Sequence, residues 1–115
     1  MVVETGSLSA AEIDALFGAL ADATRRDIVA RVIEREQSVS SLAASYAMSF
    51  AAVQKHVAVL ERASLVAKSR RGREQIVRAE PRAIARAREH LQHYENLWRH
   101  RAAAIDVILA EDLEQ

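Results

Sequence analysis

The chain has 115 residues, a length that predicts one domain with a modest hydrophobic core. Half of the residues are apolar, yet only five are aromatic, and with three glycines and one proline the composition favours packed helices over a turn-rich β fold. The absence of cysteine excludes disulfides, thiolate metal sites and cysteine nucleophiles. No stretch has the length of a membrane span, and residues 1–7 do not resemble a signal peptide, so we expect a cytoplasmic protein with no membrane partner.

The net charge is zero, but the charges are distributed unevenly along the chain. Residues 1–49 carry four basic and seven acidic side chains, residues 50–88 carry ten and three, and residues 89–115 carry two and six. A basic centre of charge +7 therefore lies between acidic ends of −3 and −4. Because a polyanion responds to the local field more than to the total charge, this distribution is compatible with a nucleic-acid partner.

Two amphipathic helices are predicted in the first third of the chain. The sequence Ser9-Ala10-Ala11-Glu12 matches the capping-box pattern and opens a helix over residues 9–20, preceded by a flexible N-terminus over residues 1–8. The residues that share an apolar face in this helix are Ile13, Leu16, Phe17 and Leu20. Asp22 is the expected N-cap of a second helix. The apolar side of the second helix consists of Ile28, Val29, Val32 and Ile33.

Arg25 and Arg26 lie at the start of the second helix, where a cation opposes the helix dipole. Two interpretations account for them. Either the nearby Asp22 and Asp27 compensate their charge, or the arginines contact phosphate.

A helix-turn-helix is predicted over residues 40–62. Ser40 is the expected N-cap of a short helix that runs through Tyr46, and a tight turn at Ala47-Met48 leads into Ser49. Ser49 is a good N-cap for the next helix, because its hydroxyl can accept from a first-turn amide that otherwise lacks a partner. The residues of this helix with the spacing of one buried stripe are Val53, Val57 and Leu60.

The opposite face of this helix mixes small, amide and cationic side chains, and these are Ala51, Gln54, Lys55, Ala58 and Arg62. Small residues allow the backbone to approach DNA, glutamine can pair with adenine, and lysine can reach guanine or phosphate. This pattern is typical of a recognition helix. An ordinary amphipathic surface helix is the alternative for this stretch taken alone.

Two short strands are predicted over residues 65–79, on either side of Arg71-Gly72-Arg73. Gly72 supplies the positive φ that a hairpin tip needs. A basic hairpin directly after a recognition helix is typical of a wing, in which Arg70, Arg71 and Arg73 reach flanking phosphates or the minor groove. The alternative interpretation is a solvated loop tip that carries charge.

Pro81 suits the first turn of a helix, and no glycine or proline interrupts the chain over residues 82–112. The predicted helix has about thirty residues and a length of about 45 Å. Its apolar stripe consists of Ile84, Ala87, Leu91, Tyr94, Trp98, Ala102, Ile105 and Leu109. Because a lone helix would expose this stripe, we expect residues 9–20 and 82–112 to form a homodimer, with burial inside one chain as the alternative. The expected interface residues are Ile13, Leu16, Phe17, Leu91, Tyr94, Trp98, Ile105 and Leu109.

Taken together, these motifs resemble the ArsR family of small bacterial winged-helix repressors. The segment Leu20–Ile28 is similar to the LADPTRR-type opening of the family, with Ala23 where proline is usual. Further similarity lies in Ser41-Leu42-Ala43, Met48-Ser49, Ala52–Val57 and Val59-Leu60 for the helix-turn-helix, and in Leu65-Val66 and Arg70–Arg73 for the wing. In the last helix, Tyr94, Trp98 and Arg101 resemble a subgroup without metal sites. The resemblance implies a mainly α fold with a small β-hairpin, in which four helices, two strands and a last helix form one winged helix-turn-helix domain over residues 1–115.

The resemblance also implies which residues contact double-stranded DNA. Carried onto this sequence, the contacts fall on Ser49, Gln54, Lys55 and His56, with Arg70, Arg71 and Arg73 supporting from the wing. Ala51 and Phe50 complete the expected surface. Phe50 departs from the family, where arginine or another polar residue is often found. The phenyl ring either touches a thymine methyl group or folds back beside Val53 and Val57.

Metal sensors of the family usually place cysteines in the third helix, and the matching segment Ser41–Ser45 has none. A second family site uses acids and histidines of the last helix, where His90, His93 and His100 occur. One pair of histidines from each subunit is compatible with tetrahedral zinc, but histidines beside an interface more often bind nothing. We therefore expect no metal and no cofactor.

These observations predict a homodimeric repressor that acts on a pseudo-palindromic operator. The alternative is a winged-helix protein-interaction module that does not bind DNA. An enzyme is not expected, because no glycine-rich phosphate loop, nucleophile motif or partnered carboxylate pair is present. Three ways of releasing the repressor are compatible with the sequence: an unknown small-molecule effector at the dimer interface, a metal, or the abundance of the protein itself.

Overall fold

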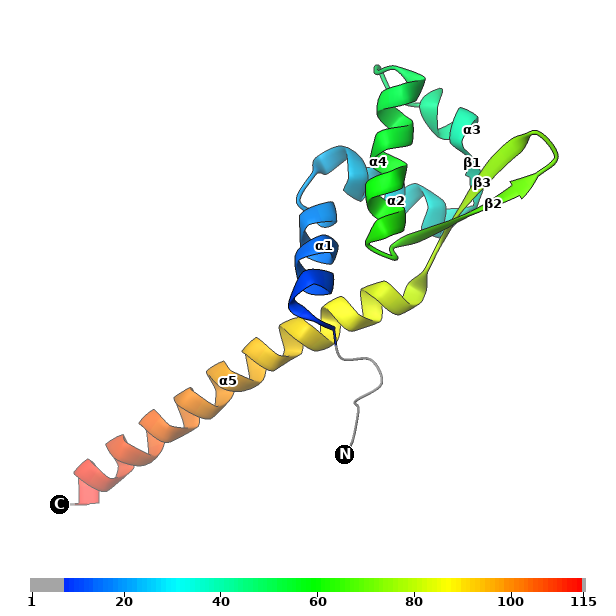
Figure 1. Ribbon diagram of the computed structural model, residues 1–115. Helices are drawn as coiled ribbons and strands as arrows, with labels where there is room; N and C mark the ends of the chain where they lie inside the picture. The colour runs from blue at the N-terminus through cyan, green and yellow to red at the C-terminus, as the bar shows by residue number, and fades with distance from the viewer. Residues whose placement is uncertain (1–7, 115) are drawn as a thin grey trace, which may run out of the picture.

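The computed structural model describes residues 8–114, and Figure 1 shows a helical head from which one long helix extends. The elements follow the order α1 (Ala10–Leu20), α2 (Ala23–Glu34), β1 (Gln37–Ser38), α3 (Val39–Ala43), α4 (Phe50–Arg62), β2 (Val66–Arg71), β3 (Glu74–Ala79) and α5 (Pro81–Glu114). This mainly helical order with a small antiparallel sheet confirms the predicted fold class. Residues 1–7 of the expected flexible N-terminus lie outside the described residues, whereas Leu8 packs against the core.

Serine and aspartate side chains begin the first two helices as predicted. Ser9 Oγ accepts from the Glu12 amide at 3.1 Å, and Glu12 Oε1 accepts from the Ser9 amide at 3.0 Å, which completes the capping box of α1. Asp22 Oδ2 accepts from the Arg25 amide at 2.9 Å at the start of α2. These bonds satisfy first-turn amides that have no partner inside their helix.

The segment between α2 and α4 differs from the expectation in three places. Ser38, not Ser40, is the N-cap of α3, since its hydroxyl accepts from the Ser41 amide at 3.0 Å. The helix ends at Ala43 rather than at Tyr46, so the turn toward α4 is longer than predicted. Strand β1, in which Gln37 pairs with Val77 and Ser38 with Ile76 of β3, was not predicted from the sequence. A strand of two residues is too short to show a periodic pattern.

The three strands form one antiparallel sheet in the order β1-β3-β2. The hairpin of β2 and β3 turns at Gly72, whose φ of 65° has the sign that the sequence predicted for this position. Ser49 begins α4 as expected, because its hydroxyl accepts from the Ala52 amide at 3.1 Å. Pro81 is the first residue of α5.

The hydrophobic core lies between the helices of the head and the sheet. Its fully buried large side chains are Ile28, Leu42, Val53, Val57, Leu60, Leu65, Val66 and Val77. The predicted stripe of α4 is therefore confirmed. Two residues correct the expectation: Ile33 is 60% exposed and lies outside the core, and Leu16 is only 2% exposed because it packs inside its own chain.

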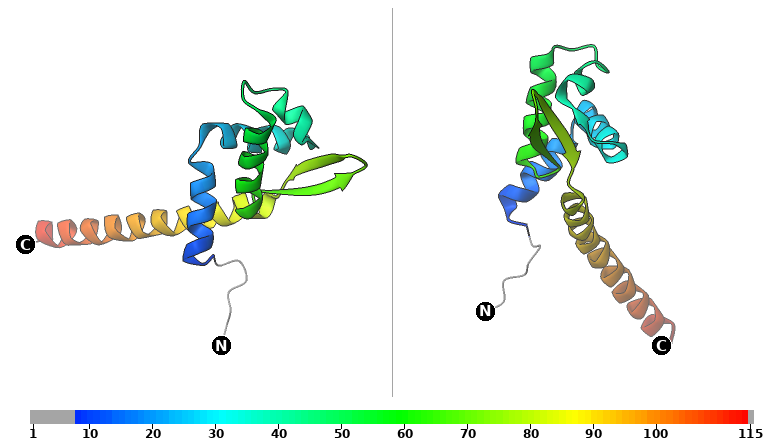
Figure 2. Two further views of the ribbon diagram at one scale, coloured as in Figure 1. Left: turned by 45° about the horizontal axis from the view of Figure 1, so that its top comes forward. Right: turned by 90° about the vertical axis from the view of Figure 1, so that its right-hand side faces the viewer.

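Helix α5 packs on the head only near its start, through Ala83 and Ala87. From Leu91 onward every described side chain is exposed, and Figures 1 and 2 show the helix extending away from the head. Burial of the apolar stripe within one chain, the alternative to dimerisation, therefore does not occur beyond the first turns. Within residues 8–114, no helix is both long and apolar enough to cross a bilayer.

Ser64 at the end of α4 is the non-glycine residue with a positive φ, of 60°, in the described chain. The Ser64 amide donates to the Glu61 carbonyl at 3.0 Å and the Leu65 amide to the Leu60 carbonyl at 3.0 Å. This pair of bonds is the Schellman motif, which favours glycine at the position of Ser64 because a Cβ atom is strained there.

We expect Ser64→Gly to raise the free energy of unfolding by about 1 kcal/mol, since it removes that strain. Gly72→Ala is the reverse substitution at a second residue with positive φ. It adds a Cβ atom that meets no neighbouring atom within 4 Å, so only the backbone conformation is strained. It should lower the free energy of unfolding by a similar amount. Urea unfolding of both variants measures the two changes, and a destabilised Ser64→Gly protein would contradict the interpretation.

Candidate nucleic-acid interface

The solvent-facing side of α4 carries the residues predicted to read DNA. Ala51, Gln54 and Lys55 are exposed, while the stripe behind them is buried. Phe50 is 47% exposed and does not join the core, so its ring does not fold back beside Val53 and Val57. The helix thus presents a small residue, an amide, an amine and an aromatic ring from its first two turns.

His56 lies on a different side of α4 from Gln54 and faces the junction of α1 and α2. Its side chain is 23% exposed, and its Nδ1 lies 3.3 Å from Nη1 of Arg25 and 3.9 Å from Oδ2 of Asp22. The structure therefore does not bring His56 together with Gln54 and Lys55 on one exposed face. Its contacts connect α4 to the start of α2.

Arg25 and Arg26 have a role that neither sequence interpretation included. Arg25 Nε donates to the Ala19 carbonyl at 2.8 Å and its Nη2 to the Gly18 carbonyl at 3.1 Å. Arg26 Nη1 donates to the Leu20 carbonyl at 2.8 Å. The two guanidinium groups thus satisfy the last carbonyls of α1, a helix whose own last turn has no basic residue. Asp22 and Asp27 do not form ion pairs with these guanidinium groups within the described residues.

The hairpin of β2 and β3 lies beside α4 and is joined to it at its base. Lys68 of β2 forms an ion pair with Glu61 of α4 at 3.5 Å. Side chains alternate along a strand, so Arg70 lies on the same face as Lys68, whereas Arg71 lies on the other. The Arg71 guanidinium donates to Glu36 at 3.0 Å. Arg70 and Arg73 are exposed near the tip.

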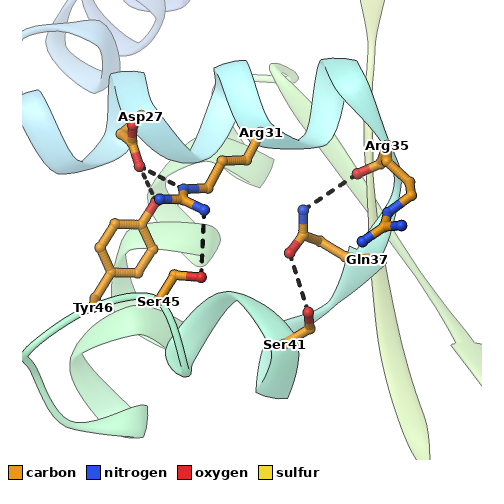
Figure 3. A network of polar contacts seen from close by, with 7 residues as sticks. All are labelled: Asp27, Arg31, Arg35, Gln37, Ser41, Ser45 and Tyr46. Atoms are coloured by element: carbon orange, nitrogen blue, oxygen red, sulfur yellow. Dashed lines mark hydrogen bonds and ion pairs between the residues drawn. The ribbon is translucent and has the colours of Figure 1, made fainter.

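A polar network fixes the turn that precedes α4, and Figure 3 shows its residues. The Tyr46 hydroxyl donates to Asp27 Oδ2 at 2.5 Å, and Arg31 Nε donates to the same oxygen at 2.7 Å. The Arg31 guanidinium lies 5.3 Å from the centre of the Tyr46 ring and donates to the Ser45 hydroxyl at 3.4 Å. This network was not predicted from the sequence, although Asp27 and Arg31 have the i, i+4 spacing of a helical ion pair.

The network shifts the ionisation equilibria of Tyr46 and Asp27. Burial and the hydrogen bond to Asp27 raise the pKa of Tyr46 to about 12. The hydrogen bonds from Tyr46 and Arg31 hold the pKa of Asp27 below its ordinary value. The Asp27 interactions stabilise the fold above the carboxyl pKa of the unfolded chain and are lost as pH falls through the lowered value. The Tyr46 interaction stabilises it below the ordinary tyrosine pKa and is lost as pH rises through about 12.

The predicted dimer residues lie on two helices that contact each other. The Phe17 ring of α1 lies 5.8 Å from the His90 ring of α5, and His90 lies 5.2 Å from Tyr94 in an edge-on arrangement. Further along α5, the exposed apolar side chains include Leu91, Trp98, Ile105 and Leu109. Of the eight interface residues expected from the sequence, Leu16 is the exception, because it is buried in its own chain and has no surface for a partner.

The histidines of α5 do not gather into a metal site within one chain. In the described part of the chain, no group of three or more histidine or acidic side chains is placed to hold a metal ion. His90 instead packs between Phe17 and Tyr94, and His93 lies 5.9 Å from Tyr94.

No family profile and no curated protein sequence matches the chain. Solved structures do match. An ArsR-like transcriptional regulator from Rhodococcus sp. RHA1 is 35% identical, with a TM-score of 0.76, over 85% of this chain and 92% of its own. An ArsR family transcriptional regulator known from a crystal structure is 26% identical, with a TM-score of 0.76, over 81% and 96% of the two chains.

A third match shows the fold alone, because its sequence identity is 24%. It is the homodimeric winged helix-turn-helix DNA-binding domain of a possible ArsR-family regulator from Mycobacterium bovis. The alignment covers 84% of this chain and 94% of that domain, with a TM-score of 0.61.

We expect Tyr46→Phe to lower the free energy of unfolding at pH 7 by about 1 kcal/mol, because Asp27 loses a hydrogen bond. The pKa of Asp27 should rise toward its ordinary value in the same variant. NMR titration of the Asp27 carboxyl carbon and urea unfolding measure the two effects. Tyr94→Phe is the control, since Tyr94 is 53% exposed and its hydroxyl has no hydrogen bond within the described residues. An unchanged Asp27 titration in Tyr46→Phe would contradict the assignment.

Proposed function

The chain belongs to the ArsR family of winged helix-turn-helix transcriptional regulators, and from that premise we propose that it is a homodimeric repressor of transcription. Each subunit places α4 in the major groove of double-stranded DNA and lays the β2–β3 hairpin along the flanking backbone. The regulator acts in the cytoplasm and needs no metal or cofactor.

One observation carries this proposal: an exposed face of α4 and a basic hairpin are held side by side. The buried stripe of α4 turns Ala51, Gln54 and Lys55 to solvent, and the Lys68–Glu61 pair joins the base of the hairpin to the same helix. The region from residue 50 to residue 88 carries the excess of seven positive charges. A surface of this kind binds phosphates strongly and reads base edges from its centre.

The contacts divide between specificity and affinity. Gln54 and Lys55 reach base edges, and exposed Phe50 is placed for an apolar contact such as a thymine methyl group. Ser49 and Ala51 lie at the same end of α4 and allow close approach of the backbone. Arg70 and Arg73 bind phosphate, and Arg71 must exchange its bond with Glu36 for the same contact. His56 acts indirectly, because it holds α4 against the start of α2.

The second copy of the chain covers α5. The helix leaves the head with apolar side chains exposed along one stripe, and such a surface is unusual on a monomer. The similar domain from Mycobacterium bovis is homodimeric. We infer that Ile13, Phe17, Leu91, Tyr94, Trp98, Ile105 and Leu109 contact the partner. Two-fold symmetry then presents two α4 helices to half-sites about one helical turn of DNA apart.

Two double variants test the division of contacts on DNA selected by the protein from a random pool. Gln54→Ala with Lys55→Ala should lower affinity for the selected site by about ten-fold or more and leave nonspecific binding nearly unchanged. Arg70→Ala with Arg73→Ala should weaken binding to every sequence and reduce the slope of log affinity against log salt by roughly two. Mobility shift measures both.

Equal behaviour of the two double variants would refute the division. If the wild-type protein fails to retard any DNA at low salt, the protein is not a DNA-binding repressor. The alternative of a winged helix that docks on another protein would then be favoured.

The dimer is tested by two residues on opposite sides of α5. Ile105 lies on the apolar stripe, and Val107 is two residues away, which places it about 200° around the helix. The side chains of Ile105 and Val107 are 45% and 56% exposed in one chain, so the two positions have similar exposure and differ mainly in which face of α5 they occupy. Sedimentation equilibrium should show that Ile105→Glu raises the dimer dissociation constant by at least about ten-fold, whereas Val107→Glu leaves it within about two-fold. The same response in both variants would sink the proposed interface.

A further inference from the structure

A cavity of about 430 Å³ lies where α1, the C-terminal end of α4 and the first turns of α5 meet. Its apolar wall is formed by Leu8, Ala11, Ala15, Leu16, Ala63 and Ala83. The volume falls in the range of small-molecule sites, which are mostly apolar and carry a few polar groups that orient the ligand.

The polar lining of the cavity is dominated by arginine. Arg62 comes from the end of α4, while Arg82 and Arg86 come from the start of α5. Within residues 8–114, no hydrogen bond or ion pair engages the guanidinium groups of Arg62 and Arg82. Hydrogen bonds from Ser9 and the charge of Arg86 lower the pKa of Glu12. The two acids of the lining are already in use, because Glu12 accepts the Ser9 amide at 3.0 Å and Glu80 pairs with Arg78 at 3.5 Å.

We propose that this cavity is an effector site for a small monocarboxylate with an apolar chain. The planar guanidinium groups of Arg62 and Arg82 match a carboxylate, which can accept two parallel hydrogen bonds from one arginine. The apolar chain of the ligand lies on the alanine and leucine wall. Glu12 and Glu80 disfavour a doubly charged anion such as phosphate, because their negative charges lie in the same lining.

The cavity lies on the flank of α1 away from the proposed dimer interface. Ala15 lines the cavity, whereas Ile13, two residues earlier and therefore about 200° around the helix, belongs to the expected interface. A second chain on Ile13 and Phe17 thus leaves the cavity open. A ligand inside it contacts the end of the recognition helix and the start of the dimerisation helix at once.

This arrangement gives the ligand a way to release DNA, an inference that rests on the proposed repressor function. The spacing of two α4 helices in a dimer depends on how each α4 sits relative to α1 and α5. A ligand wedged among these three elements favours one spacing over another, and DNA binding favours the spacing that fits the half-sites.

The site itself is tested without DNA, by isothermal titration calorimetry of the full chain in Tris chloride. The probes are hexanoate, acetate, 1-hexanol and inorganic phosphate. Hexanoate should bind at least about ten-fold more tightly than each of the other three, because it alone has one carboxylate and an apolar chain. No heat of binding with hexanoate, or phosphate binding as tight as hexanoate, would overturn the proposal.

Three variants locate the binding. Arg82→Gln should weaken hexanoate binding by at least about ten-fold, and Arg88→Gln, on the same helix but outside the cavity, should leave it within about two-fold. Ala15→Leu fills the cavity without removing a charge and should also weaken binding by about ten-fold. Because Ala15 is exposed, the larger side chain does not disturb the core. Retention of hexanoate affinity in both Arg82→Gln and Ala15→Leu would place the ligand elsewhere and overturn the site.

DNA affinity measured with and without saturating hexanoate separates the two proposals. Hexanoate should lower the affinity of the wild-type protein for its selected site by at least about three-fold and leave that of Ala15→Leu unchanged. Hexanoate binding without any DNA binding would refute the proposed repressor function and support the ligand site. DNA binding without hexanoate binding would sink the ligand site alone, and binding of both without mutual effect would overturn the coupling.

Discussion

Burial of one stripe of α4 is the constraint on which the rest of the structure depends. Val53, Val57 and Leu60 are fully buried, and each contributes about 1.5–3 kcal/mol relative to an exposed position. Because helical residues three or four apart share a face, burying these three turns Gln54 and Lys55 outward. The exposed polar face of α4 is therefore set by the apolar contacts behind it.

Side chains that satisfy helix ends and turns place the neighbouring elements around α4. Arg25 and Arg26 bind the last carbonyls of α1, so the first helix is held by the start of the second. Asp27 accepts a hydrogen bond from the Tyr46 hydroxyl, so α2 holds the turn before α4 in place. The first set joins consecutive helices and the second joins α2 to the turn before α4, and together they give α4 one orientation relative to α1.

Local patterns predicted much of this architecture, because caps and apolar stripes depend on residues within one helix. Ser9, Asp22 and Ser49 all accept the amide three residues later, as their positions indicated. Contacts between distant segments were not predictable. The carbonyl partners of Arg25 at Gly18 and Ala19 are only six or seven residues away, but they depend on how α2 turns against α1. The cap at Ser38 lies beside the pairing of Ser38 with Ile76 of β3, a contact between distant segments.

In the candidate site, too, some side-chain positions follow from local pattern and others depend on contacts between elements. The outward position of Gln54 and Lys55 follows from helical periodicity, whereas the inward position of His56 depends on where α2 begins. Leu16 and Ile13 share an apolar face in the sequence, yet the packing of α5 and α4 against α1 buries Leu16. Periodicity identifies an apolar face but does not say which part of it the same chain covers.

The exposed stripe of α5 has a consequence for gene control. In the proposed dimer, two chains cover this apolar surface and are in equilibrium with single chains, so the fraction of dimer depends on total protein concentration. Well below the dissociation constant of the pair, the amount of paired protein grows with the square of the number of chains. For the proposed repressor, promoter occupancy would then switch over a narrower range of expression than a monomer allows, and the contacts along α5 would set that threshold.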